Sequence, residues 1–393
     1  MTQQTLTELF RQSKLEEASA RLQQGERLPG NIASFDRRQI YTVLAQARAF
    51  GLVQALVDQG FIETDLYEYE SLDDSPFPAL FRKLEDNPDD LTFLQTLLGQ
   101  LDNINDAVQD KTLMELALLS AAPVAVIRTL IDAGCMVRYK DNYEINYLHK
   151  VVREFGIKEE LGSAYLELLI GEGIDPNESD IVGETPLHLA ISKMKKGYID
   201  VLLAQGADPN QQDKKGESAY YQALVHQVAG TELYEKMKAY AMPDFDSRNK
   251  EEETLLSGAV RMRYGASERD IALVKALIED GADVYQVSPY YSRDKSAVAW
   301  IAEKPSEWLQ ALLDMGVVDI ERKDDRGNTL LHQVCAIDVN YDQEAAKQVY
   351  RKVKLLLAHG ADAQATNDAE QTPALLAGQD NLKAKTVELL LKK

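Results

Sequence analysis

One segment of about 33 residues contains a helix start, a turn and a helix stop. It constrains the possible fold of this chain more than any other feature of the sequence. In GETPLHLAISKMKKGYIDVLLAQGADPN, residues 183–210, Thr185 can cap a helix through its hydroxyl, and Pro186 suits the first helical position because it has no N–H to leave unpaired. A second apolar run ends at Gly206, since glycine takes the left-handed position after a helix without steric cost. The segment is a helical hairpin with a loop, and a hairpin of this size buries too little apolar surface to fold alone.

Copies of the helix stop recur along the chain. An apolar run that ends in glycine occurs at Gly60, Gly134, Gly173, Gly206, Gly281, Gly316 and Gly360. The intervals are 74, 39, 33, 75, 35 and 44 residues, so each of the two long intervals predicts one concealed stop. We place these stops at LLGQLDNIN, where Leu101 stands in the glycine position, and near Ala241 in KAYAMPDFD. Self-similarity with this period is typical of a solenoid, in which each unit buries its apolar face against the next.

The best-preserved copy resembles an ankyrin repeat. TPLHLA at residues 185–190, followed by GADPN at 206–210, is similar to the T-P-L-H-x-A pattern of that family. Weaker copies are NYLHKV (146–151), SAYYQA (218–223), TLLSGA (254–259), TLLHQV (329–334) and TPALLA (372–377).

This resemblance covers roughly residues 110–393 and implies an all-α, ankyrin-like helical-hairpin solenoid of about nine to ten stacked repeats. We expect one continuous solenoid, with N-terminal capping helices in residues 1–30, degenerate acidic repeats in 31–110, and ankyrin repeats with a C-terminal cap in 111–393.

Three repeats are longer than the copy at Thr185. That copy takes 21 residues to its glycine, whereas the copies at Asn146 and Thr254 take 27 each and the copy at Thr329 takes 31. The additional residues fall between the two helices, in REFGIKEELGSA, MRYGASERD and AIDVNYDQEAAKQVYR. We expect them to lengthen the helices or their connecting turns, at the end opposite the Asp-Pro loops.

Three histidines occupy the last position of the TPLH pattern: His149, His188 and His332. The resemblance implies buried imidazoles that bond to the backbone of adjoining turns. Equivalent positions in neighbouring hairpins lie about 8–10 Å apart, whereas ligands of one zinc ion lie within about 4 Å of one another. The sequence therefore predicts no metal site and no cofactor. His226 and His359 lie on helix C-terminal segments with no evident partner.

No catalytic motif is present. The sequence lacks G-x-S-x-G, a Walker loop, G-x-G-x-x-G and H-E-x-x-H. Cys135 follows a helix stop and Cys335 lies on an apolar face, so both are predicted to be packing residues that are too far apart for a disulfide. We expect no catalysis, and we take the run Glu251–Glu253 as charge at a helix N-terminus.

The expected location is cytoplasmic and reducing. The N-terminus MTQQTLTELFRQS lacks the charged start and apolar core of a secretory signal. The longest apolar stretch, 116–127, is interrupted by Pro123 and is too short to span a bilayer, so we expect no membrane contact.

Negative charge is the feature that points to a partner. The formal net charge is −21, and residues 56–110 hold fourteen Asp and Glu against Arg82 and Lys83. Within them, YEYESLDDSPFP alternates aromatic and acidic residues in an expected loop, which suits a basic protein surface and repels nucleic acid. The candidate contact residues are Tyr67, Glu68, Tyr69, Glu70, Asp73 and Asp74. Improved solubility of a monomer is the alternative interpretation.

The remaining aromatic residues divide between contact and core. Tyr290 and Tyr291 lie in an expected loop between repeats and are candidates for partner contact. Trp300 and Trp308 have the spacing of a packed hairpin core. For Tyr220 and Tyr221, one ring is expected to be buried and the other exposed.

Two functions remain open. The first is a non-catalytic scaffold that binds another protein through its solenoid surface. The second is an immunity protein or antitoxin, bacterial in origin, that masks a basic toxin or enzyme with the acidic N-terminal third. A hydrolase is a third class, but it would need a site that carries none of the known motifs.

Overall fold

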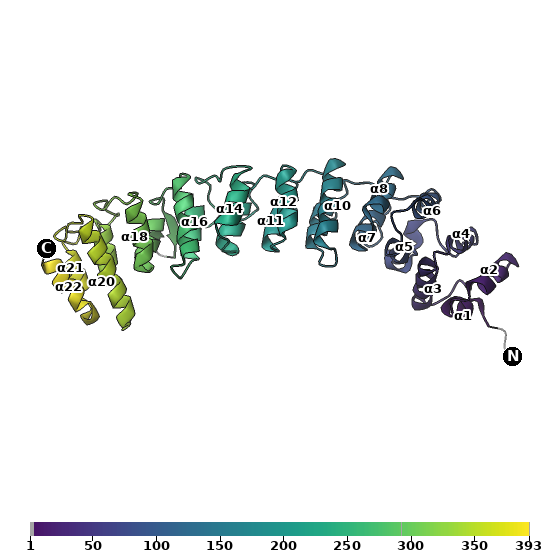
Figure 1. The fold of residues 1–393 in the computed structure, drawn as a ribbon, viewed down its shortest axis with the longest axis horizontal. Coiled ribbons are helices and arrows are strands. Elements are labelled where there is room, and N and C mark those ends of the chain that lie inside the picture. The colour runs from purple at the N-terminus through teal and green to yellow at the C-terminus, as the bar shows by residue number, and fades with distance from the viewer. Residues whose placement is uncertain (1–3, 292, 393) are drawn as a thin grey trace. The chain divides into compact units, whose positions relative to one another are not determined.

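The computed structural model describes residues 4–291 and 293–392, and these form two compact units, Met1–Ala207 and Asp208–Lys393. Helices dominate both units (Figure 1), which confirms the predicted all-α class. The helices pair into hairpins that follow one another in chain order, six in the first unit and five in the second. The division at residues 30 and 110 stays a prediction.

The first unit consists of two layers of helices. Alternate helices pack against one another, α1 on α3, α3 on α5, α5 on α7, α7 on α9 and α9 on α11, while α6, α8, α10 and α12 pack in a second layer. The helices are α1 (Leu6–Arg11), α2 (Leu15–Gln23), α3 (Ser34–Gln46), α4 (Phe50–Asp58), α5 (Phe77–Phe81), α6 (Pro88–Leu98), α7 (Leu113–Leu119), α8 (Val124–Asp132), α9 (Tyr147–Arg153), α10 (Glu159–Gly171), α11 (Pro186–Ser192) and α12 (Lys196–Ala204), with 3₁₀ turns η1 (Leu66–Glu68) and η2 (Leu72–Asp74).

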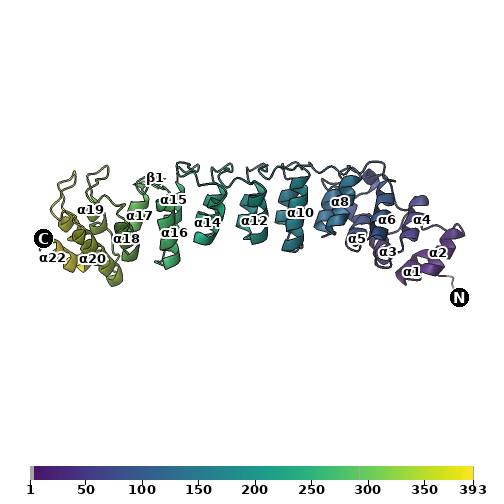
Figure 2. The same ribbon diagram turned by 45° about the horizontal axis from the view of Figure 1, so that its top comes forward.

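The second unit repeats this arrangement. The first helices α15, α17, α19 and α21 form one layer, and the second helices α14, α16, α18, α20 and α22 form the other. Its elements are α13 (Ala219–Tyr221), the π turn η3 (Gln222–His226), α14 (Thr231–Lys238), α15 (Leu255–Arg261), α16 (Glu268–Glu279), β1 (Ser288–Tyr290), β2 (Arg293–Lys295), α17 (Ala297–Glu303), α18 (Ser306–Asp314), α19 (Leu330–Cys335), α20 (Gln343–Ala358), α21 (Pro373–Ala377), η4 (Asn381–Lys383) and α22 (Ala384–Leu391). In each unit, the loops that join successive hairpins lie at the same end of the helices (Figure 2).

The helix boundaries follow the predicted chemistry. Thr185 caps α11 by accepting a bond from the backbone N–H of His188, and Pro186 is the first helical residue. All seven glycines at the predicted helix stops have φ between 69° and 115°. This left-handed backbone closes the helix C-terminus, and it is strained for residues with a Cβ.

The concealed stop at Leu101 works without a left-handed residue. Leu101 is not among the described residues with positive φ, and α6 instead ends at Leu98, with Gly99 as its C-cap at φ −67°. Asn105 identifies the position, because its Nδ2 donates to Gly134 O at 3.0 Å just as Asn177 donates to Gly206 O. The second concealed stop lies close to Ala241, since α14 ends at Lys238.

The insertions lengthen the second helix of their hairpins, as expected. In the regular copy α12 has 9 residues, whereas α10 has 13, α16 has 12 and α20 has 16. The remaining inserted residues form the turns between the paired helices. These turns carry three exposed aromatic side chains, Phe155, Tyr264 and Tyr341.

Buried cations join successive hairpins in the second unit. The side chains of Arg263, Lys304, Lys352 and Lys383 are almost fully buried, and each donates to carbonyl oxygens at the end of the first helix of the preceding hairpin. These carbonyls have no partner within their own helix, and a cation is favourable at a helix C-terminus. Burial lowers the pKa of Lys304 and of Lys352 to about 8. The acceptors are the carbonyls of Leu224, Ala229, Arg261, Arg263, Ala302, Lys304, Cys335 and Ile337.

Candidate protein-binding surface

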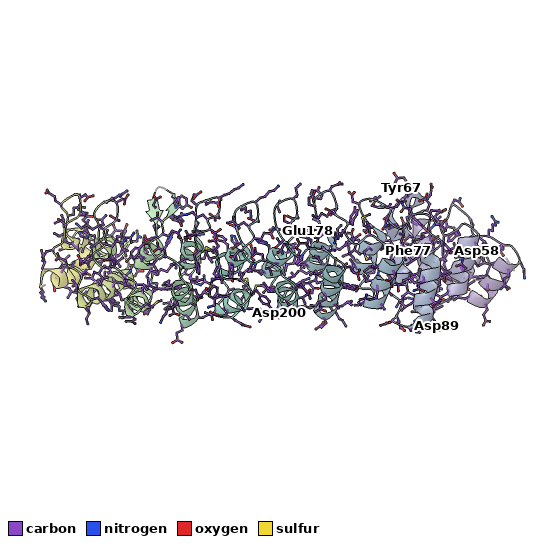
Figure 3. The ribbon with its side chains drawn as sticks, turned by 90° about the horizontal axis from the view of Figure 1, so that it is seen from above. Asp58, Tyr67, Phe77, Asp89, Glu178 and Asp200 are labelled. Carbon is purple, nitrogen blue, oxygen red and sulfur yellow. The ribbon has the colours of Figure 1, made fainter. Side chains whose placement is uncertain are left out.

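The acidic loop between α4 and α5 is an ordered structure built from two 3₁₀ turns. Asp65 caps η1 by accepting a bond from the Tyr67 N–H at 2.9 Å, and Ser71 caps η2 in the same way. Gln109 Nε2 donates to Glu70 O at 2.9 Å and ties the loop to the next one along the unit. In Figure 3, Tyr67 lies at the edge of the unit where the loops gather, and Asp89 lies at the opposite edge.

The loop exposes one tyrosine and buries the other. The side chain of Tyr67 is 74% exposed, and Glu68 and Glu70 are exposed beside it. Tyr69, in contrast, is 5% exposed, because its ring packs into the core while its hydroxyl donates to Glu63 O at 3.3 Å. Burial raises the pKa of this hydroxyl. The inclusion of Tyr69 among the contact residues is therefore corrected: it anchors the loop.

Two of the predicted acidic contacts already have cationic partners within the chain. Asp73 accepts from Lys111 Nζ at 3.0 Å, and Asp74 lies 3.6 Å from Arg38 Nε. Within residues 4–291 and 293–392, no ion pair is found for Glu68 or Glu70. The loop surface that is left for a partner consists of Tyr67, Glu68 and Glu70, which we call the acidic loop tip.

The second candidate surface is the β-hairpin in the other unit. Strands β1 and β2 pair antiparallel, with Ser288 opposite Lys295. Tyr291 at the turn is 95% exposed. Tyr290, in contrast, is half-buried, because its ring packs edge-on against Trp300 with 4.6 Å between the ring centroids. Tyr290 therefore supports the hairpin, and Tyr291 is the side chain that projects into solvent.

Several other predicted placements change with the structure. Tyr220 and Tyr221 are both buried, so the expected division between them is wrong: the ring of Tyr220 packs against Tyr234 of α14, and the hydroxyl of Tyr221 donates to Glu253. His226 does have a partner, since its Nε2 lies 2.9 Å from Glu217 Oε2. Glu253 lies just before the N-terminus of α15, as expected, but it is buried and pairs with Arg261 at 2.7 Å.

The histidines of the TPLH pattern are buried bridges between turns. His149 Nε2 lies 2.9 Å from Glu184 O, and its Nδ1 lies 2.7 Å from Asn146 Oδ1. His332 repeats this arrangement with Gln371 O at 3.1 Å and with its own cap, Thr329. Nowhere in the described part of the chain do three His, Cys, Asp or Glu residues form a group that could hold a metal ion.

Comparison with known proteins agrees with these repeats. The family model of the ankyrin repeat matches residues 182–214. The fold matches the crystal structure of the ankyrin repeat domain of Bcl-3, described as a unique member of the IkappaB protein family. Residues 182–214 thus match one ankyrin repeat, and the chain has the fold of an ankyrin-repeat domain. The match to Bcl-3 has 22% sequence identity and a TM-score of 0.50, and it covers 64% of this chain and 100% of that one, so it establishes the fold alone. No curated protein matches this chain.

Some properties of this protein had no clear signal in the sequence. Nothing marks Arg263 or Lys352 as buried, because charged residues in repeats are ordinarily exposed. Cys135, taken as a packing residue, lines a cavity. The sequence did contain a sign that this loop is unusual, since GCMVR stands where the regular repeat has GADPN. Among the described helices, none is long and apolar enough to cross a membrane.

Acidification is expected to destabilise the folded protein through His149 and His332. Burial lowers the pKa of both imidazoles below the ordinary value of about 6.5, so the unfolded chain binds more protons than the folded chain below that pH. Stability that is fully present above pH 6.5 is therefore lost as the pH falls through 6.5 toward the lowered pKa values. Thermal unfolding at pH 7.5 and pH 5.5 would show a fall in Tm.

A variant in which both histidines are replaced by glutamine provides the control. Carboxylates also titrate as the pH falls, and His226, whose pKa is raised by Glu217, acts with the opposite sign. Both contributions are common to the two proteins, so they cancel in the comparison. An equal fall in Tm for the variant and the parent would contradict a role for the two imidazoles.

Proposed function

We propose that this protein is a non-catalytic scaffold that holds another protein against the loop edge of its hairpins. The observation that supports this most directly is the acidic loop tip: Tyr67 is exposed on an ordered loop that also carries two exposed carboxylates, Glu68 and Glu70, which have no ion-pair partner among the described residues. Tyrosine is enriched among residues that dominate binding energy, because its ring supplies contact area at low entropic cost.

The proposed partner is basic. Residues 56–110 carry a net charge of −12, from fourteen acidic residues and two basic ones. A field of this sign raises the association rate of a cationic partner by about 10- to 1,000-fold at low salt and opposes the approach of phosphates. The structure supports this proposal by leaving Glu68 and Glu70 exposed.

We assign no catalytic role to any side chain. The TPLH histidines are occupied with backbone carbonyls, and burial raises the pKa of both cysteine thiols to about 12, which disfavours the reactive thiolate. Both cysteines are free, which suits the reducing, cytoplasmic location that we propose.

A second candidate function is inhibition of a basic toxin or enzyme, as an immunity protein or antitoxin. The concentration of charge in residues 56–110 favours it, because tight inhibitors often use one charged surface to capture one target. The two functions differ in their partners. An inhibitor retains one basic enzyme at a 1:1 ratio and abolishes its activity, with strong salt dependence, whereas a scaffold does not inhibit what it binds.

Charge reversal at the acidic loop tip is expected to weaken capture of the partner. In a variant that combines Glu68→Lys with Glu70→Lys, the association rate should fall at least about tenfold at low salt, because the field changes sign where the partner docks. The measurement is capture of partners from the native lysate by immobilised full-length protein, followed by association kinetics with the protein identified.

The matched control combines Asp86→Lys with Asp89→Lys. These residues are also exposed and belong to the same acidic segment, and Asp89 lies at the opposite edge of the unit (Figure 3). The control changes the net charge by the same amount, so a general field effect would slow both variants equally. If the parent protein, the loop-tip variant and the control variant associate with the partner at equal rates, the acidic loop tip is not part of the binding surface.

A further inference from the structure

A cavity of about 180 Å³ lies in the first unit, between the loop that follows α6 and the loop that precedes α9. Its lining combines apolar, sulfur-containing and aromatic side chains, chiefly Ile104, Met114, Cys135, Met136, Tyr139 and Tyr147. Met136 is 53% exposed and Tyr139 is partly exposed, whereas Met114, Cys135 and Tyr147 are buried. The cavity therefore has a buried floor and an accessible rim.

The two loops around the cavity are fixed to each other. Asn105 donates from Nδ2 to Gly134 O at 3.0 Å and accepts a bond from Met136 N–H at 2.6 Å. At the floor, the hydroxyls of Thr112 and Tyr147 bond to each other at 2.7 Å. The floor therefore presents no unpaired hydroxyl from these two residues, and it suits an apolar occupant better than a polar one.

The two loops that line the cavity differ in sequence from the regular repeat. Regular loops of this chain carry a buried proline, such as Pro176 in GIDPN. The two loops here read LDNIN and GCMVR, so Ile104 and Val137 replace proline. Cys135 and Met136 occupy the positions of alanine and aspartate in GADPN, which gives the rim apolar side chains where the regular repeat has a charge.

The volume restricts the size of the occupant. Sites for cofactors and drug-sized ligands usually measure about 300–1,000 Å³, whereas an apolar cavity of about 150 Å³ accommodates one benzene molecule. A cavity of about 180 Å³ is therefore large enough for one leucine, methionine or phenylalanine side chain and too small for a cofactor.

The charges around the rim restrict what carries that side chain. Residues 102–144 contain seven acidic and four basic residues. Three of the basic residues are already paired: Lys111 with Asp73 at 3.0 Å, Lys140 with Glu178 at 3.3 Å, and Arg128 with Glu172 at 3.9 Å. Of the acidic residues, Glu115 and Asp141 are paired with Lys150, so the excess of unpaired charge is acidic. An apolar side chain carried on a basic segment complements both the cavity and its surroundings.

We propose that this cavity is an anchoring pocket for one large apolar side chain on a basic segment of the partner protein. The proposal rests on the proposed binding function and adds the chemistry of the partner: a bulky apolar residue flanked by lysine or arginine. Anchor residues that fill a preformed pocket supply a large share of the energy of an interface, while surrounding charges steer the approach.

Three synthetic peptides test the pocket with the full-length protein. The first has one phenylalanine between two pairs of lysines, the second has alanine in place of phenylalanine, and the third has glutamates in place of the lysines. The first peptide should bind roughly 10- to 50-fold more tightly than the second, because the pocket buries its ring. It should also protect Met136, which is 53% exposed at the rim, from oxidation to the sulfoxide by dilute hydrogen peroxide, while the equally exposed Met242 in the other unit serves as the internal reference.

Filling the cavity provides the matched variant. Cys135→Phe places a ring in the space, so it should abolish the preference for phenylalanine over alanine while leaving the folded chain intact. Should this variant fail to fold, protection of Met136 in the unaltered protein still decides the matter. Equal binding of the phenylalanine and alanine peptides, no binding of the phenylalanine peptide, or binding without protection of Met136 would each overturn the pocket.

The outcomes separate this inference from the proposed function. If both lysine peptides bind equally and the glutamate peptide does not, the acidic surface stands and the pocket is overturned. If the phenylalanine peptide protects Met136, and the reversal at Glu68 and Glu70 leaves partner capture unchanged, the pocket stands without the acidic loop tip.

Discussion

Replacement of Arg263 by methionine is expected to lower the free energy of unfolding of the second unit by about 3–5 kcal/mol. The side chain is 1% exposed and bridges three elements. Its Nη1 donates to Leu224 O at 2.8 Å and to Ala259 O at 2.7 Å, and its Nη2 donates to Ala229 O at 2.6 Å. Methionine fills most of the volume but leaves these carbonyls unpaired, and each unpaired buried group costs about 1–3 kcal/mol.

Two further substitutions separate the causes. Arg263→Lys keeps the charge but cannot reproduce the planar fork of donors, so its loss should be intermediate. Arg269→Met removes an exposed arginine nearby and should change the free energy of unfolding by less than about 0.5 kcal/mol. The measurement is urea denaturation followed by circular dichroism. A loss at Arg263 no larger than the loss at Arg269 would contradict the bridging role.

Truncation of Trp308 to alanine is expected to cost a similar amount, about 3–5 kcal/mol. Trp308 is fully buried on α18, and its indole N–H donates to Gly265 O at 2.7 Å in the turn that precedes α16. Alanine leaves a cavity and also releases this turn. Trp308→Phe keeps most of the apolar area and should cost about 1 kcal/mol, because mainly the hydrogen bond is lost.

Trp300 supplies the comparison, because the chain contains only two tryptophans. Its ring is 9% exposed and meets Tyr290 edge-on, with Lys295 Nζ 3.9 Å from the ring centroid. Trp300→Ala should therefore be less destabilising than Trp308→Ala. In each variant the remaining tryptophan reports unfolding by its fluorescence. The reverse order of stability would show that the β-hairpin depends on Trp300 more than α18 depends on Trp308.

The sequence predicted only part of the candidate site in the acidic loop. Its excess of carboxylates and its two tyrosines are visible in the sequence, and the loop does lie at the edge where the loops gather. The sequence could not distinguish Tyr67 from Tyr69, because the period of two places both rings on the same face of a strand, whereas this segment forms 3₁₀ turns. It also could not show that Arg38 and Lys111 reach Asp74 and Asp73, since these partners lie more than 35 residues away.

The sequence by itself determined where helices begin and end. Capping at Thr185, proline at the first helical position and glycine at seven helix stops act over four or five residues, so they can be read without neighbours. The tertiary structure alone decided which side chains are buried between hairpins: Arg263, Tyr69, Tyr220 and the lining of the cavity beside Cys135. The physical reason is that each hairpin buries its surface against the next one in its unit, so burial depends on contacts across about 30–50 residues, which no local pattern records.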